Sequence, residues 1–286
     1  AHQILSTRES MEASHALMNA LHHYPRKVNA YLHEWNARIQ RLNEALTRLE
    51  FVSLEKYSQE RLQSEFRVLN AAIQDFWNIT LAIEGFSPFL DHEYLPAFEK
   101  ETGDAKKTKD AFNALTTPTE PSFIGESRRD LLSLIIRFLH NPKERKELLE
   151  KETPDALAFI YAHKPAFYYA LLEHRQKYHW TQNSYAEWTV LSVADFFEFI
   201  RDAVHGSTIS LLKEEFKRLQ EPKELTEQQE RWARVLGLSP TRVKELEFIR
   251  KITWLKDERK RYILKMLHAQ YGFLHEFARR ANLDPK

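Results

Sequence analysis

One short stretch of the chain gathers the kinds of side chain from which a small-molecule site is built. Between His174 and Trp188 it holds two histidines, two tryptophans and two tyrosines among amides and hydroxyls. Aromatic rings supply contact area and polar groups supply orientation, as a ligand pocket requires. The same residue types also suit a helix-ending corner in which tyrosine and tryptophan tips bond the local backbone. Composition alone allows both interpretations.

A second candidate is Arg259, which lies on an apolar stripe of the C-terminal segment. Leu255 precedes it by four residues and Tyr262 follows it by three, so all three share one helix face. An arginine that faces a core needs a partner, because an unpaired buried charge is costly. Its planar guanidinium suits a phosphate or carboxylate ligand. A glutamate from a neighbouring helix would also satisfy it, as would a side chain that reaches solvent.

The last quarter of the chain is basic. Residues 213–286 carry 18 basic and 12 acidic side chains, whereas residues 1–212 carry 24 and 29. This favours an anionic ligand in the C-terminal quarter, unless these residues form an ordinary solvated helix face. The near-neutral total argues against nucleic acid as a partner. Binding of nucleic acid through the basic last helix would be strongly salt-dependent.

Composition excludes several kinds of site. The chain has no cysteine, which removes disulfides, thiolate metal sites and cysteine nucleophiles, and which suits a cytoplasmic location. Its six glycines stand too far apart for a glycine-rich phosphate-binding loop. The one Glu12-x-x-His15 spacing lacks a second copy, so we expect no metal held by this chain alone. No segment is apolar enough to span a membrane.

The elements that must position these residues are helices. Apolar residues recur at steps of three and four from Val28 to Leu49, and a second long helix is predicted over 59–83. Serine or proline starts predict further helices over 127–139, 154–162 and 165–178. Ser239 and Pro240 begin the longest helix, of about 30 residues, which meets no glycine before Gly272. We therefore expect an all-α, multi-helix bundle with a long C-terminal helix.

We expect one helical domain over residues 1–286, or two subdomains that meet near 101–122. Residues 116–123 contain two prolines and four hydroxyl side chains, which predicts an ordered loop. Three further stretches are predicted to be solvated connections: 101–110, 140–153 and 220–230.

Three stretches of the chain resemble phosphoenolpyruvate (PEP) synthase-like phosphotransferases, the group of pyruvate,water dikinase and rifampicin phosphotransferase. The first stretch is His174-x-x-Lys177-Tyr178-x-Trp180-x-x-Asn183-x-Tyr185. The second is the run from Leu246 to Tyr262, and the third is a loop made of 115–118 and 121–123. In that family an ATP-grasp domain phosphorylates a histidine on a swivelling domain, which carries the phosphoryl group to an acceptor. The likeness is to the helical part of these proteins, where the acceptor sits.

The resemblance implies a helical substrate-binding domain of a PEP-utilising phosphotransferase of the kinase or dikinase type. Such a domain is incomplete as a catalyst alone, because the ATP-grasp and phosphohistidine domains, which would bind ATP and Mg²⁺, are lacking. It implies a small-molecule or phosphorylated acceptor as ligand, separate ATP-grasp and swivelling domains as partners, and no cofactor or metal on this chain. The residues that would face the acceptor or its phosphate are His174, Lys177, Trp180, Asn183, Tyr185, Arg250 and Arg259. No catalytic residue is assigned.

A different class of function fits the same sequence. Long amphipathic helices and 29% charged residues are equally typical of an all-helical protein–protein interaction module without a small-molecule site. In that case the aromatic residues at 178–188 would be ordinary core residues.

Overall fold

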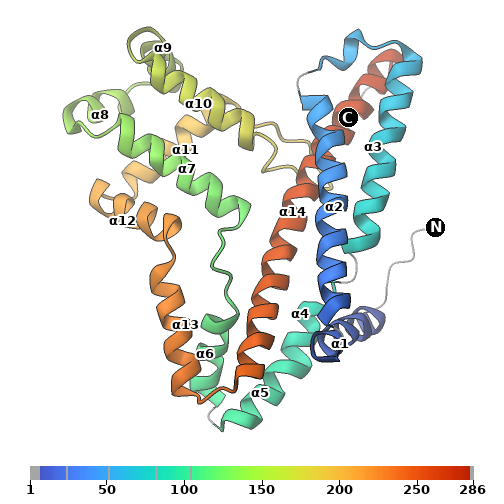
Figure 1. Ribbon diagram of the computed structural model, residues 1–286. Helices are drawn as coiled ribbons and strands as arrows, with labels where there is room; N and C mark the ends of the chain where they lie inside the picture. The colour runs from blue at the N-terminus through green and yellow to red at the C-terminus, as the bar shows by residue number, and fades with distance from the viewer. Residues whose placement is uncertain (1–6, 24, 51, 81–82, 104, 284–286) are drawn as a thin grey trace. The chain divides into compact units, whose positions relative to one another are not determined.

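The structure is a computed structural model that describes residues 7–23, 25–50, 52–80, 83–103 and 105–283. Every regular element in these ranges is a helix, and the longest is α14 near the C-terminus (Figure 1). The predicted all-α fold with a long C-terminal helix is therefore confirmed. Within the same ranges, no helix combines the length and the apolar character needed to cross a lipid bilayer.

Most of the helices predicted from periodicity are present. Those predicted over 127–139, 154–162 and 165–178 correspond to α7, α9 and α10. The one predicted over 59–83 corresponds to α3, and residues 81 and 82 lie outside the described ranges. The elements in chain order are α1 (Thr7–His23), α2 (Pro25–Glu50), the 3₁₀ turn η1 (Leu54–Lys56), α3 (Gln59–Thr80), α4 (Phe86–Phe89), the π-helical turn η3 (Leu90–Tyr94), α5 (Leu95–Thr102), α6 (Ala105–Thr116), α7 (Phe123–Phe138), α8 (Pro142–Leu149), α9 (Thr153–His163), α10 (Pro165–Tyr178), α11 (Val193–His205), α12 (Ile209–Gln220), α13 (Lys223–Val235) and α14 (Pro240–Arg280).

The chain forms two compact units. Unit 1 consists of residues 1–119 and 225–286, and unit 2 of residues 120–224. Unit 2 thus interrupts unit 1 in the sequence. The chain returns to unit 1 after residue 224, within the first turn of α13. The helix is continuous at this point, so no loop in the sequence marks the boundary.

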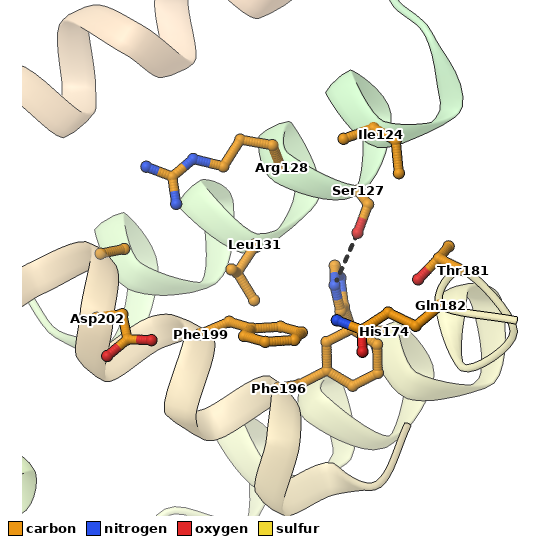
Figure 2. Close-up of a pocket in the computed structure, with 11 residues that line it drawn as sticks. Ile124, Ser127, Arg128, Leu131, His174, Thr181, Gln182, Phe196, Phe199 and Asp202 are labelled. Atoms are coloured by element: carbon orange, nitrogen blue, oxygen red, sulfur yellow. Dashed lines mark hydrogen bonds between the residues drawn. The ribbon is translucent and has the colours of Figure 1, made fainter. Parts of the chain in front are cut away.

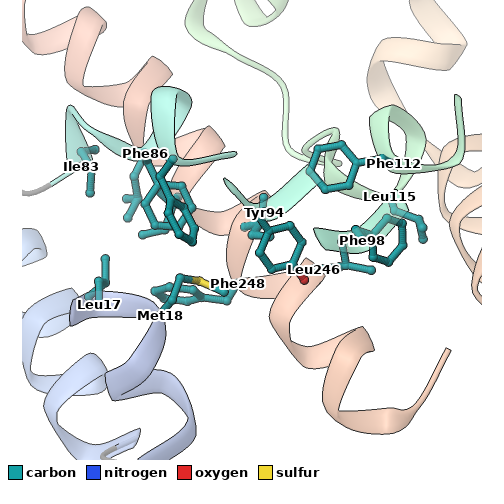
Figure 3. Close-up of a cluster of buried hydrophobic side chains, with 14 of the residues drawn as sticks. Leu17, Met18, Ile83, Phe86, Tyr94, Phe98, Phe112, Leu115, Leu246 and Phe248 are labelled. Atoms are coloured by element: carbon teal, nitrogen blue, oxygen red, sulfur yellow. The ribbon is translucent and has the colours of Figure 1, made fainter. Parts of the chain in front are cut away.

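Unit 1 is organised around α14. Leu246 and Phe248 of α14 belong to a cluster with side chains of α1, α2, α4, α5 and α6, part of which is drawn in Figure 3. Further along α14, Met266 and Phe273 belong to a second cluster with side chains of α2 and α3. One helix serves both clusters because its apolar positions recur along most of its length.

The helix α14 is longer than the sequence predicts. It spans 41 residues and continues through Gly272. Beyond this glycine, the rings of Phe273 and Phe277 lie 5.2 and 5.5 Å from the ring of Phe66. Packing of these side chains against α3 stabilises the helix after Gly272. A Cβ at Gly272 would lie 3.7 Å from Cδ1 of Leu54, an ordinary contact, so the glycine marks no boundary.

The three stretches predicted as solvated connections contain helix, so that prediction is wrong. Residues 105–110 begin α6, residues 142–149 form α8, and residues 223–230 begin α13. In α8, Asn141 accepts hydrogen bonds from the backbone of Lys143 and Glu144, and Pro142 occupies the first turn. Only Leu148 and Leu149 of this helix are buried. A short capped helix needs few apolar residues, so its charged composition resembles that of a loop.

Unit 2 has a core of its own. Each of α7, α9, α10, α11 and α12 contributes fully buried aliphatic side chains, among them Leu132, Ile160, Leu171, Ile200 and Leu212. The sequence predicts a loop over 116–123, and residues 117–122 connect α6 of unit 1 to α7 of unit 2, while Thr116 ends α6 and Phe123 begins α7.

A buried amide fixes the end of α6 in unit 1. Gln229 of α13 donates from Nε2 to the carbonyls of Ala114 and Thr117, each at 2.9 Å. Its Oε1 accepts a hydrogen bond from Nη1 of Arg250 on α14 at 2.7 Å. Because Pro118 has no N–H, the Ala114 carbonyl cannot find the usual partner four residues on. Gln229 supplies that partner and ties α6, α13 and α14 together.

Replacing Gln229 should destabilise the chain. Gln229→Ala leaves two carbonyls and the Arg250 guanidinium without their amide partner, so we expect the free energy of unfolding to fall by about 1–3 kcal/mol. Urea unfolding followed by circular dichroism measures the change. Gln228→Ala is the control, since Gln228 is half-buried in α13 and its side chain forms no hydrogen bond within the described ranges. Equal destabilisation by both variants would contradict this role for Gln229.

Candidate functional site

Unit 2 contains a cavity of about 500 Å³ bordered by α7, α10, α11 and the turn that follows α10 (Figure 2). This volume lies in the range of small-molecule pockets. Ser122 caps the start of α7, and Ser192 and Asp195 form a capping box at the start of α11. These caps fix the N-terminal ends of the two helices. The lining residues are Ile124, Ser127, Arg128, Leu131, His174, Thr181, Gln182, Phe196, Phe199, Asp202 and Ala203.

His174 is a buried polar residue in the wall of this cavity. Its ring centroid lies 4.7 Å from that of Tyr178 and 4.8 Å from that of Phe196. Its Nε2 lies 3.5 Å from Oγ of Ser127 (Figure 2). Burial lowers the pKa of His174 to about 4, and the nearby charge of Asp130 only partly offsets this. The imidazole is therefore neutral at pH 7, with one nitrogen that donates a hydrogen bond and one that accepts.

Asp130 joins α7 to α10. Its Oδ2 accepts hydrogen bonds from Nζ of Lys177 at 2.6 Å and from the Tyr178 hydroxyl at 2.7 Å. Its Oδ1 accepts from Nη2 of Arg129 at 3.2 Å. Burial opposes the ionisation of Asp130, but these hydrogen bonds outweigh it and hold the pKa of Asp130 below its usual value. Lys177, a predicted ligand-binding residue, is therefore engaged by Asp130 and is not among the described residues that line the cavity.

The other predicted residues of this stretch shape the turn after α10. Asn183 donates from Nδ2 to the Trp180 carbonyl at 3.0 Å, and its Oδ1 accepts from the Thr189 backbone at 2.9 Å. Trp180 is buried, with its ring 5.8 Å from that of Phe123. Tyr185 is 70% exposed. None of Trp180, Asn183 and Tyr185 belongs to the described lining of the cavity, to which the turn contributes Thr181 and Gln182 instead.

Sequence reasoning missed the contributions of α7 and α11. The lining residues of α7 lie at spacings of three and four, as do those of α11, so each set occupies one helix face. This periodicity could have identified the faces. It could not have shown that they meet His174, because that depends on how α7, α10 and α11 pack.

Arg128 carries the positive charge in the described lining, and it is already paired. Its Nε and Nη2 donate to the two carboxylate oxygens of Glu215 on α12, both at 2.9 Å. Such a bidentate pair is strong and geometrically specific. The hydrogen bonds from Arg128 also hold the pKa of Glu215 below its usual value.

Arg250 and Arg259 belong to unit 1, where both have protein partners. Arg250 donates to Gln229, as described above. Arg259 is buried and forms an ion pair with Glu84. Burial lowers the pKa of Arg259, and the nearby Tyr31 opposes this shift. The sequence allows three alternatives for Arg259, namely a ligand anion, a glutamate partner or a side chain that reaches solvent, and the structure supplies a glutamate.

The described residues contain no group of three or more histidine, aspartate or glutamate side chains placed to hold a metal ion. Asp202 is the carboxylate of the described lining, whereas Asp130 and Glu215, outside it, bind lysine, arginine and tyrosine side chains. The chemistry open to the cavity is thus hydrogen bonding, apolar contact and charge pairing with Asp202.

Comparison of the chain with protein-family models, with curated proteins and with solved structures gave no match. A relationship to PEP synthase-like phosphotransferases therefore depends on the three motif stretches alone.

Acid should destabilise unit 2 through His174. Its pKa is about 4 in the folded chain, against 6.5 for an exposed histidine, so between these values the unfolded state binds the proton more strongly. The contribution of His174 to stability is complete above pH 6.5 and is lost as the pH falls to about 4, by at most about 3 kcal/mol.

Urea unfolding at a series of pH values measures this loss. His174→Gln should flatten the profile between pH 6.5 and 4 relative to wild type. His205→Gln, at an exposed position of α11, should leave the profile unchanged. A His174→Gln profile that runs parallel to that of wild type would show that His174 is not the titrating group.

The pairing of Arg259 with Glu84 should appear in a double-mutant cycle. Arg259→Met should lower the free energy of unfolding by about 2 kcal/mol, less than for a fully buried pair, since the Glu84 side chain is 38% exposed. Glu84→Gln should cost less in that background than in wild type. Additive effects of the two substitutions would mean that the ion pair contributes nothing to stability.

Proposed function

We propose that this chain is the helical, acceptor-binding part of a PEP-utilising phosphotransferase, and that the cavity of unit 2 holds the acceptor. One observation carries the proposal. The described lining of the cavity contains His174, the first residue of the motif that resembles these enzymes, and Thr181 and Gln182 of the same stretch. The cavity has the volume of a small-molecule site and combines apolar walls with convergent polar groups, as such sites do.

The chemistry of the lining supports an acceptor that carries a hydroxyl group. His174, Ser127, Thr181 and Gln182 offer neutral donors and acceptors, which suit a hydroxyl group. With a pKa of about 4, His174 is a weak base near neutral pH, so its role would be to orient the hydroxyl rather than to remove its proton. Orientation is a large part of what phosphoryl transfer asks of a protein.

The phosphoryl donor would come from elsewhere. The sequence has no glycine-rich phosphate loop, so ATP and Mg²⁺ would bind to an ATP-grasp domain, and a swivelling phosphohistidine domain would deliver the phosphoryl group. These domains would be the macromolecular partners of the chain. Together with the absence of cysteine, this reaction favours a cytoplasmic location.

A panel of ligands tests the acceptor site. Thermal unfolding would be followed with phosphate, pyruvate, PEP, ATP, AMP and a set of small alcohols. A ligand at 100 times its dissociation constant adds about 2.7 kcal/mol to stability, which raises the midpoint visibly. We expect an alcohol-bearing ligand to raise the midpoint of wild type, and Gln182→Ala to reduce that shift.

Gln176→Ala is the matched control for this experiment. Gln176 is exposed on α10 and is not among the lining residues, so its replacement should leave the ligand-induced shift unchanged. A shift that both variants retain in full would place the ligand elsewhere. No shift with any ligand of the panel would count against the acceptor site and favour the second candidate.

The second candidate is a protein–protein interaction module, which the exposed tyrosines of α9 and α10 favour. Tyr161 and Tyr169 are 62% and 58% exposed, and both rings contact the ring of Tyr168. Tyrosine is enriched at protein interfaces. If this candidate is correct, a pull-down with wild type should recover a stable partner. The double variant Tyr161→Ser/Tyr169→Ser should no longer recover that partner. A pull-down with no stable partner counts against it.

A further inference from the structure

The two ends of the cavity differ in charge and polarity (Figure 2). Arg128 and Asp202 lie toward one end, Thr181 and Gln182 lie toward the other, and Leu131 and Phe199 lie between them. His174 and Ser127 are at the same end as Thr181 and Gln182. A ligand that spans the cavity thus meets charged groups at one end and neutral polar groups at the other.

The charged end contains one carboxylate that has no protein partner within the described ranges. Both guanidinium donors that face Glu215 are used in the bidentate pair, so Arg128 and Glu215 neutralise one another. The carboxylate of Asp202 lines the cavity and forms no hydrogen bond or ion pair within the described ranges. An anionic group placed here would be repelled by Asp202, whereas an ammonium group would be attracted.

The neutral end suits a hydroxyl group. The imidazole of His174 and the hydroxyls of Ser127 and Thr181 can each donate or accept, and the amide of Gln182 can do both. The middle of the cavity is apolar, with Leu131, Phe196 and Phe199 in its lining. Apolar and aromatic walls favour a flat or aliphatic body between the two polar ends of a ligand.

We infer that the cavity binds a small molecule with an ammonium group at one end, an apolar or aromatic body, and a hydroxyl group at the other end. Asp202 pairs with the ammonium group, and the side chains around His174 bind the hydroxyl. This inference rests on the proposed function, because it takes the cavity as the acceptor site. It narrows that proposal: the acceptor is an amino alcohol, and a phosphorylated or carboxylate ligand is disfavoured.

A matched set of probes tests the inference by isothermal titration calorimetry. Tyramine carries the ammonium group, the ring and the hydroxyl. In 3-(4-hydroxyphenyl)propionate a carboxylate takes the place of the ammonium group, 4-ethylphenol has no charged group, and phenethylamine lacks the hydroxyl. We expect tyramine to bind wild type about tenfold more tightly than the propionate, because the sign of the charge next to Asp202 is reversed. Phenethylamine should bind about fivefold more weakly than tyramine, because one hydrogen bond is lost.

Asp202→Asn is the decisive variant. It should weaken tyramine binding about tenfold and remove the preference over the propionate, while the affinity for 4-ethylphenol stays unchanged. Asp202 is at an exposed position, so the variant should fold, and an unchanged thermal midpoint without ligand checks this. Asp155→Asn, an exposed aspartate of α9 outside the lining, is the matched control and should leave all affinities unchanged.

Two outcomes overturn the inference. If the propionate binds as tightly as tyramine, or if Asp202→Asn keeps the preference for tyramine, the ligand is not an amine held by Asp202, although the cavity still binds small molecules. If tyramine does not bind wild type at millimolar concentration, the amino alcohol class is wrong. The thermal panel with Gln182→Ala and Gln176→Ala then decides separately whether the proposed acceptor site also fails.

Discussion

Burial of one face of α14 is the constraint on which unit 1 depends. This helix supplies side chains to both hydrophobic clusters of the unit, yet four charged residues also lie buried on it: Glu245, Glu258, Arg259 and Glu276. A buried charge is tolerated only when it is paired, so each of them needs a partner, either on a neighbouring element or on α14 itself. Glu245 accepts from the Tyr94 hydroxyl at 2.7 Å, and Glu258 lies 3.0 Å from Arg261.

Glu276 shows how this requirement reaches other elements. Hydrogen bonds from Arg279 and Arg280 outweigh burial and lower the pKa of Glu276 to about 2. Arg280 also donates to the carbonyls of Leu54 and Tyr57, at 3.2 and 2.7 Å, and so ties η1 to the end of α14. The apolar stripe of α14 holds the neighbouring elements. The charged side chains of α14 also help to specify where those elements pack.

In unit 2 the same rule pairs the charges of Asp130 and Arg128 with protein groups and leaves Asp202 as the unpaired charge of the described cavity lining. Asp130 is bound by Lys177, Tyr178 and Arg129, and Arg128 is bound by Glu215. The polar contact of His174 within the described ranges is the one to Ser127 at 3.5 Å, and burial keeps the imidazole neutral. A ligand in this cavity would be oriented by hydrogen bonds around His174, by its shape, and by the charge of Asp202. The basic character of residues 213–286, which drew attention to an anionic ligand, concerns α14 of unit 1 rather than this lining.

The sequence by itself determined the class of fold and most helices, because apolar periodicity and helix starts are local properties. It also indicated the stretch after residue 174 as a candidate site, on the strength of its aromatic and polar side chains. Only the tertiary structure decided which of these side chains face a cavity: His174, Thr181 and Gln182 do, whereas Lys177 and Asn183 bind protein groups. It also decided the partners of Arg250 and Arg259, and it brought α7 and α11 to the site. These outcomes depend on pairings between residues far apart in the sequence, such as Arg128 with Glu215, which local patterns do not encode.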